Sequence, residues 1–242
     1  MPRDPTLSFS AQRAARLDWK GIRADLDERG YARVPSLLSA AECRALRRLY
    51  ADEQHFRKTI DLERHRFGRG EYKYFAYPLP PLVAQLRTQL YPRLAAIAND
   101  WMKALGVRRR YPTSLARFLA HCRQRGQARP TPLMLDYTED CYNCLHQDLY
   151  GDVAFPLQLT CLLSRPGRDF AGGEFLLVEQ RPRMQSRGEA IALREGEAVI
   201  FPNRERPVRG ARGCYRTQLR HGVSRIERGR RSTLGIIFHD AR

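Results

Sequence analysis

Two histidines and one aspartate have the types and spacing of a metal site. His146-Gln-Asp148 ends a run that reads as a β-strand. Residues i and i+2 of an extended segment share a face, so both side chains can point into one cavity. With His221 from a later segment, two imidazoles and one carboxylate can occupy one face of an octahedral iron(II) and leave the other face open. Alone, the H-x-D pattern is weak, because it arises by chance in many proteins.

Arg231 is the second feature that indicates chemistry, ten positions after His221. Gly229 is expected to form the turn between them, so that the strand over residues 233–238 returns beside His221. A guanidinium in a barrel interior is costly without an anionic partner. 2-Oxoglutarate supplies one, because its keto acid end can chelate iron while its far carboxylate takes a bidentate pair from arginine. The alternative is that Arg230 and Arg231 are surface charges at the turn.

Two further side chains are candidates for contact with the same cosubstrate. Thr233 shares a strand face with Arg231 and is expected to donate a hydroxyl hydrogen bond to the carboxylate. Tyr137, on the first strand of the predicted barrel, either reaches the cosubstrate or belongs to the core. With iron(II), 2-oxoglutarate and O2, and with ascorbate as reductant, this set predicts hydroxylation of a substrate C–H bond. If that carbon is an N-methyl group, the product releases formaldehyde and leaves a free nitrogen.

The six cysteines are scattered along a mid-sized chain and do not suggest a disulfide framework. Cys141-Tyr-Asn-Cys144 is a C-x-x-C motif, so zinc has to be considered. A structural zinc site usually takes four ligands from two such pairs, and this sequence has one. The other interpretation is that the two thiols are buried or lie at a strand edge.

The elements that must position these residues begin with helices. Apolar residues recur at helical spacing over residues 11–29, and Ser39-Ala-Ala-Glu42 is a capping box that begins a second helix. A long helix is expected over about residues 81–105, with a kink at Pro92, and another near residues 114–125. These helices occupy most of the first half of the chain.

Residues 66–77 interrupt the helical region. They mix glycine, basic side chains and five aromatic residues without a clean period. Such a segment is typical of a loop that contacts a partner or substrate. The alternative is a loop that packs its aromatic rings onto the core.

After Pro130, short apolar or alternating runs are divided by Gly, Pro and Asp. Strands are expected over residues 132–137, 144–149, 157–163, 174–179, 190–194, 198–201, 215–220 and 233–238. Short strands with frequent turn signals favour a barrel or sandwich of the jelly-roll kind. Because the helices precede the strands instead of alternating with them, a parallel α/β sheet is disfavoured. The expected fold class is mainly β with N-terminal helices, a jelly-roll barrel braced by those helices.

The length and composition fit a single domain with a sizeable core over residues 1–242. About residues 1–130 would form helical support and a substrate loop, and about residues 131–242 the barrel. No apolar run approaches the roughly 18–20 residues of a membrane span. No apolar segment follows the polar N-terminus, so we expect no secretory signal, no membrane association and a cytoplasmic location. The sequence does not indicate an oligomeric state.

The formal net charge is +17, with a pI near 10.3. Such a charge favours phosphate-rich partners such as DNA or RNA. Nearly all of the positive charge is arginine, however, and it is spread over the whole chain. That composition can reflect the coding bias of a genome instead of a binding surface. The charge supports an anionic partner without locating it.

His146-Gln-Asp148, His221 and Gly229-Arg-Arg231-Ser-Thr resemble the Fe(II)/2-oxoglutarate-dependent dioxygenase superfamily. The chain is also similar, from about Asp18 to its C-terminus, to a bacterial oxygenase family described as acting in oxidative demethylation of damaged nucleic acid. The runs that carry this narrower similarity are residues 67–75, 143–151, 172–175, 220–224 and 234–240.

The resemblance implies a double-stranded β-helix barrel, iron bound by His146, Asp148 and His221, and 2-oxoglutarate bound by Arg231. Three substrate readings stay open. The first is alkylated DNA or RNA, in a DNA-repair role, with the base presented by flipping or in a single strand. The second is a protein side chain or small molecule hydroxylated by the same chemistry. The third is a catalytically silent barrel that binds nucleic acid.

Overall fold

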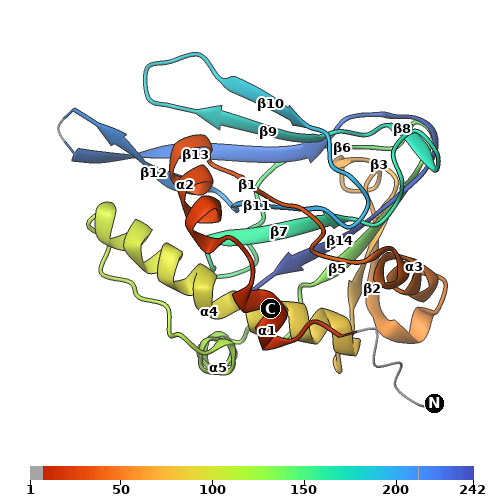
Figure 1. Ribbon diagram of the computed structural model, residues 1–242, viewed down its shortest axis with the longest axis horizontal. Helices are drawn as coiled ribbons and strands as arrows, with labels where there is room; N and C mark the ends of the chain where they lie inside the picture. The colour runs from red at the N-terminus through yellow and green to blue at the C-terminus, as the bar shows by residue number, and fades with distance from the viewer. Residues whose placement is uncertain (1–7, 212) are drawn as a thin grey trace.

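Two antiparallel β-sheets face each other, and helices cover the outer face of the larger one (Figure 1). The computed structural model describes residues 8–211 and 213–242. The expected fold class, mainly β with N-terminal helices around a jelly-roll barrel, is confirmed. The sheets hold the candidate site between them.

The helices lie mainly in the first half of the chain. They are α1 (Ala11–Ala15), α2 (Trp19–Arg29), α3 (Ala40–Leu49), the short 3-10 helix η1 (Glu53–His55), α4 (Pro81–Ala104) and α5 (Leu115–Gln124). The single helix expected over residues 11–29 is wrong, because Asp18 caps a new helix by accepting a hydrogen bond from the backbone N–H of Gly21 at 2.9 Å. The capping box of Ser39 and Glu42 is confirmed, and α4 continues through Pro92.

The larger sheet has the strand order β1-β11-β7-β14-β5-β4-β2, with β8 also paired to β14. Its strands are β1 (Ala32–Val34), β2 (Phe56–Asp61), β4 (Glu71–Phe75), β5 (Leu133–Thr138), β7 (Leu157–Leu162), β8 (Phe170–Gly172), β11 (Ala198–Pro202) and β14 (Ile226–Ile237). β14 lies at the centre, between β5 and β7, so its inward side chains face the middle of the barrel.

The smaller sheet has the order β10-β9-β13-β6-β3, with β12 paired to β13. Its strands are β3 (Gly68–Arg69), β6 (Tyr142–His146), β9 (Phe175–Gln180), β10 (Arg187–Ile191), β12 (Glu205–Gly210) and β13 (Gly213–Val223). It lies across the barrel from β14, and β6 and β13 are neighbours within it.

Two expectations about the backbone are corrected. Residues 66–77 are not one loop, since they contain β3 and β4, and β4 pairs with β5 inside the larger sheet. Gly229 does not form the turn before Arg231. The chain turns between the end of β13 at Val223 and the start of β14 at Ile226, and Gly229 lies within β14 at φ +80°. A Cβ there would lie 2.2 Å from the carbonyl oxygen of Asp169, which accounts for the glycine.

Apolar side chains form two principal layers in the described chain. One lies between the larger sheet and the helices and includes Leu94 and Phe118 from the helices with Ile236 from β14. The other lies between the two sheets and includes Phe175 and Phe201. The alternation of inward and outward residues along each strand therefore serves both layers.

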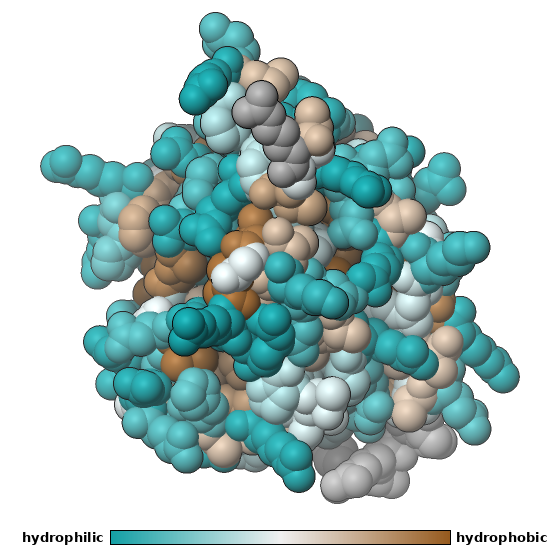
Figure 2. Space-filling model, turned by 90° about the vertical axis from the view of Figure 1, so that its left-hand side faces the viewer, coloured by the Kyte–Doolittle hydropathy of each residue, from teal (hydrophilic) through white to brown (hydrophobic). Residues whose placement is uncertain are grey.

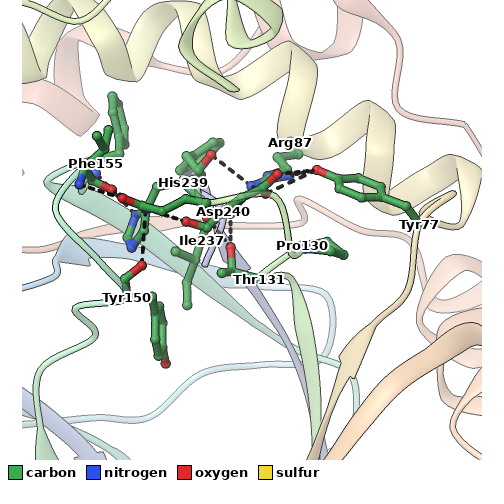
Figure 3. Close-up of polar contacts among 12 residues, drawn as sticks. Tyr77, Arg87, Pro130, Thr131, Tyr150, Phe155, Ile237, His239 and Asp240 are labelled. Atoms are coloured by element: carbon green, nitrogen blue, oxygen red, sulfur yellow. Dashed lines mark hydrogen bonds and ion pairs between the residues drawn. The ribbon is translucent and has the colours of Figure 1, made fainter. Parts of the chain in front are cut away.

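A buried ion pair fixes the C-terminal end of β14 to α4. Arg87 and Asp240 have 1% exposed side chains, and Nη2 of Arg87 donates to Oδ1 of Asp240 at 2.7 Å. Arg87 also donates to the backbone carbonyls of Ile237 and Phe238 at 3.0 and 2.9 Å. Figure 3 shows Tyr77 pointing toward the same carboxylate, to which its hydroxyl donates at 3.0 Å. These contacts hold the central strand of the larger sheet against the helical layer.

Replacement of Arg87 by leucine is expected to destabilise the protein by about 3–5 kcal/mol, because Asp240 would be left as an unpaired buried charge. Urea unfolding followed by circular dichroism measures this change. Asp152→Asn is the matched control, since its pair with Arg242 is exposed and contributes about 0–1 kcal/mol. Equal midpoints for the two variants would contradict the anchoring role.

No helix in the described ranges is long and apolar enough to cross a membrane. The face at the left of Figure 1 is covered mainly by hydrophilic side chains, with apolar residues in hollows between them (Figure 2).

Candidate active site

Strand pairing brings the two histidines together. His146 is the last residue of β6, His221 lies in β13, and the register of this antiparallel pair places them directly opposite each other. Their ring centroids are 4.2 Å apart. Asp148 lies two residues beyond the end of β6. Its Oδ2 is 3.1 Å from Nε2 of His221, and its Oδ1 is 3.7 Å from Nε2 of His146. All three residues of the predicted set therefore meet.

These three side chains fit a metal ion. One ligand atom from each lies within 4.8 Å of the others, and ligands bound at right angles about 2.1 Å from one metal are about 3 Å apart. Nδ1 of His146 donates to the carbonyl oxygen of Cys144 at 2.8 Å. This bond leaves Nε2, the atom facing Asp148, with the lone pair that a metal needs. The donor set is that of a facial-triad iron(II) site.

The protonation states also suit metal binding. Burial alone would raise the pKa of Asp148, but the hydrogen bond from His221, the two imidazole rings and the hydroxyl of Tyr150 hold that pKa well below its usual range. Burial, together with the nearby ring of His146, lowers the pKa of His221. An ionised Asp148 and a neutral His221 are the forms that bind a metal.

Arg231 is buried in the same cavity and is only 3% exposed. Its Nε has no hydrogen-bond partner, and within residues 8–211 and 213–242 no carboxylate pairs with it. Burial lowers the pKa of Arg231 to about 10, so the guanidinium stays charged at neutral pH. Arg230 points to the opposite face of β14, where its side chain is 59% exposed and pairs with Asp136 at 2.8 Å. The surface alternative therefore holds for Arg230 and fails for Arg231.

Tyr137 and Thr233 lie beside Arg231. Tyr137 is opposite Arg231 in the pairing of β5 with β14, and its buried hydroxyl has no hydrogen-bond partner. Thr233 is 1% exposed and lines the same cavity as Arg231. The expected shared face of Thr233 and Arg231 is thus observed. The guanidinium of Arg231 and the side chain of Thr233 line this end of the cavity, with Tyr137 beside Arg231 on β5, which makes this end suitable for an anion.

Gly173 is a residue whose role the sequence did not reveal. Gly172 ends β8 and Gly173 follows it, and both glycines have a positive φ, +70° and +67°. A Cβ at Gly173 would lie 2.8 Å from Cδ of Arg231 and 2.3 Å from Cδ1 of Ile226. The glycine therefore makes room for the aliphatic stem of the arginine, a contact between positions far apart in the sequence.

Tyr150, which contacts the carboxylate of Asp148, was also not identified from the sequence. Its hydroxyl donates to Oδ1 of Asp148 at 2.6 Å, which leaves Oδ2 directed at His221. The spacing from Asp148 to Tyr150 is the same two residues that separate His146 from Asp148, and this spacing is a signal that could have found it. A second hydrogen bond on a ligating carboxylate fixes its orientation.

The cavity between the sheets has a volume of about 310 Å³. The triad lines it from the smaller sheet, and Arg231 with Thr233 lines it from the larger sheet. The ring centroids of Phe175 and Phe201 lie 5.9 and 4.7 Å from the ring centroid of His221. These two apolar rings shield the inner side of the imidazole from water. A cavity of this size accepts a small cosubstrate and part of a substrate.

The zinc interpretation of the C-x-x-C motif gains no support. Cys141 is buried and Cys144 is exposed. Over the described ranges, His146, Asp148 and His221 are the one group of three or more such side chains close enough to share a metal.

The fold is similar to that of solved 2-oxoglutarate, iron(II) oxygenases. A prolyl-4-hydroxylase of Pseudomonas putida aligns over 93% of this chain and 99% of its own, with a TM-score of 0.53 and 16% identity. An oxidoreductase of the 2OG-Fe(II) oxygenase family from Burkholderia pseudomallei aligns over 92% of each chain, with a TM-score of 0.54 and 15% identity. The two facing sheets are therefore the double-stranded β-helix of this class of enzyme.

Residues 70–241 match the model of the Oxygenase-NA family, described as "Oxygenase, catalysing oxidative methylation of damaged DNA". The chain belongs to this family of oxygenases. The chain is also 50% identical over 167 residues to the uncharacterized protein Rv2227 of Mycobacterium tuberculosis strain H37Rv. This alignment covers 69% of this chain and 72% of that protein. The resemblance drawn from the sequence is confirmed at the level of family and fold.

Proposed function

We propose that His146, Asp148 and His221 hold iron(II), and that Arg231, Thr233 and Tyr137 hold the far carboxylate of 2-oxoglutarate. When bound, iron and cosubstrate supply the oxidation of a substrate C–H bond by O2. The chain's own residues fix the ligand geometry, neutralise the carboxylate and keep water from the inner side of the cavity. The observation that carries the proposal is the buried guanidinium of Arg231 in the same cavity as the triad, where no carboxylate of the described residues pairs with it.

We further propose that the substrate is alkylated nucleic acid and that the oxidised carbon is an N-methyl group. The hydroxylated methyl would leave as formaldehyde and restore the free nitrogen. The family description names damaged DNA, and the net charge of +17 favours a phosphate-rich partner. A single-stranded or flipped base would have to enter the cavity between the sheets.

The segment between β2 and β4 supports this substrate class. Phe67 lines the cavity and is 49% exposed, and the ring of His65 stacks on it with centroids 5.4 Å apart. Arg64 and Arg66 flank His65 and are exposed. Exposed stacked rings beside arginines suit bases and phosphates of a single strand. The part of the expected contact loop that precedes β3 therefore lies at the cavity mouth.

Succinate release with iron(II), ascorbate and 2-oxoglutarate tests the proposed function. Methylated oligonucleotides are expected to stimulate it and to yield formaldehyde in equal amount, whereas unmethylated oligonucleotides are not. Stimulation by peptides or small metabolites alone would favour a hydroxylase of another substrate. Tight oligonucleotide binding without any succinate would favour a silent binding barrel.

Replacement of Phe67 by alanine is expected to weaken oligonucleotide binding about tenfold, since stacking of one base on an aromatic ring contributes about 1–3 kcal/mol. Fluorescence anisotropy at fixed salt measures this change. Met184→Ala is the matched control, because Met184 is 60% exposed and does not line the cavity. Equal binding by both variants would show that Phe67 is not part of the nucleic-acid surface.

A further inference from the structure

Gln158 carries a buried amide that the protein itself does not use. It lies on β7, is 3% exposed and lines the cavity. Its Nε2 has no hydrogen-bond partner, and its side chain makes no hydrogen bond within residues 8–211 and 213–242. In the sheet it is paired with Phe201 of β11 and Ile237 of β14, neither of which offers a polar side-chain atom.

A second buried glutamine shows what a structural amide looks like in this fold. Nε2 of Gln127 donates to the carbonyl oxygens of Tyr150, Val153 and Asp240 at 3.2, 2.9 and 2.6 Å. Its Oε1 accepts from the backbone N–H of Val153 at 2.8 Å. Gln127 is saturated and ties the segment after Asp148 to the C-terminus, whereas the amide of Gln158 faces the cavity unpaired. An unpaired buried amide costs stability, so its presence calls for a partner that arrives with a ligand.

Gln158 lies at the opposite end of the cavity from the residues proposed for the cosubstrate carboxylate. Thr233 is paired with Leu162 of β7, and Ile237 is paired with Gln158. Those four residues along β7 correspond to about 13 Å at 3.3 Å per residue. Ile237, the neighbour of Gln158 on β14, also lines the cavity and is apolar. The charged side chains in the cavity lining are Asp148 and Arg231, and Arg231 lies six residues from Ile237 along β14. This end therefore suits a neutral, flat group and not a phosphate or an ammonium.

We propose that Gln158 is the specificity residue for the substrate, and that it hydrogen-bonds the edge of a nucleobase that has a donor beside an acceptor. A primary amide offers that same pair of groups, so the two edges can bond bidentately. This inference rests on the proposed function and goes beyond it by assigning base recognition to one end of the cavity. Gln158 touches the substrate's edge and leaves 2-oxoglutarate binding to Arg231.

The variant Gln158→Leu tests this assignment, because leucine removes the hydrogen bonds while filling similar space. Its Tm without substrate is expected to rise by about 2–4 °C, since an unpaired amide is replaced by an apolar group. The KM for a methylated oligonucleotide is expected to rise about tenfold. The KM for 2-oxoglutarate is expected to stay unchanged, because Arg231 is proposed to hold the far carboxylate of the cosubstrate. Gln127→Leu is the contrasting variant, and its Tm is expected to fall.

Three results would overturn the role of Gln158. They are a lower Tm for Gln158→Leu, an unchanged oligonucleotide KM, or a raised KM for 2-oxoglutarate. The first would show a structural amide, and the third would place it against the cosubstrate. If the unaltered enzyme turns over a methylated oligonucleotide and the variant has the same KM for it, the role of Gln158 is refuted and the proposed function stands. An unaltered enzyme that turns over no methylated oligonucleotide removes the proposed function and the base assignment together.

Discussion

Replacement of Asp148 by alanine is expected to abolish the conversion of 2-oxoglutarate to succinate, including the slow conversion that needs no substrate. Asp148 is the one carboxylate among the three proposed ligands, and its Oδ2 lies 3.1 Å from His221. Without it, two neutral imidazoles remain, and iron(II) affinity should fall by well over the 10–100-fold that even an outer-shell change costs. His146→Ala is expected to give the same result. Iron content after dialysis and succinate release measure both effects.

Asp152→Ala is the matched control for this loss. Asp152 follows Asp148 by four residues, and its side chain is 68% exposed and pairs with Arg242 at the surface. This variant is expected to keep full succinate release and full iron content. Normal turnover by the Asp148 or His146 variant would refute the proposed triad, provided that circular dichroism shows both to be folded.

That His146, Asp148 and His221 lie close together could be predicted from the sequence, because a metal site needs these residue types side by side. His146 and Asp148 are two residues apart, and Arg231 needs an anion wherever it is buried. The pairing of His146 with His221 across β6 and β13 could not be predicted, since register is a long-range property. The H-x-D spacing still brings the side chains of His146 and Asp148 together, although Asp148 lies past the end of β6.

The strands β2 and β4 show why the first half of the chain was harder to interpret. β4 contains Tyr72, Lys73 and Tyr74, and its alternation is hidden because both faces are covered. Tyr74 is 6% exposed, and Lys73 is 7% exposed on the other face, where its ammonium contacts Glu53 and the carbonyl oxygen of Tyr50. A lysine buried beside a carboxylate reads as a surface residue in the sequence. Tertiary contacts, and not local periodicity, make this segment a strand.

Gly173 and Gln158 could not be found from the sequence for a related reason. The function of Gly173 is to leave space for Arg231, which is 58 positions away in the chain. Gln158 stands in a strand of six buried residues, four of them apolar, where a polar side chain is easily taken as exposed. Its meaning comes from what surrounds it, an apolar wall and a cavity. Residues that act by complementarity become visible once the fold is known.

Replacement of Arg231 by alanine is expected to raise the KM for 2-oxoglutarate about thirtyfold or more while iron binding stays intact. Arg231 is buried and pairs with no carboxylate in the part of the chain that the structure describes, so the cosubstrate would supply its counter-charge. Loss of a buried, charge-assisted pair costs about 2–5 kcal/mol, which is a factor of thirty or more in affinity. Arg231→Lys keeps the charge but loses the planar guanidinium that binds a carboxylate through two hydrogen bonds. Its KM for 2-oxoglutarate is expected to lie between those of the unaltered enzyme and Arg231→Ala. Succinate release against 2-oxoglutarate concentration measures all three enzymes.

Arg230→Ala is an unusually close control, because Arg230 precedes Arg231 in β14 and points to the other face of the sheet. Its guanidinium pairs with Asp136 outside the cavity, so its loss removes the same charge from the same strand. It is expected to leave the 2-oxoglutarate KM unchanged. Since long-range charge acts on both positions alike, a large effect at Arg231 with none at Arg230 isolates direct contact with the cosubstrate. Equal increases in the KM for 2-oxoglutarate would show that Arg231 acts only through the overall positive potential of the protein. An unchanged KM in the Arg231 variant would show that the carboxylate binds elsewhere.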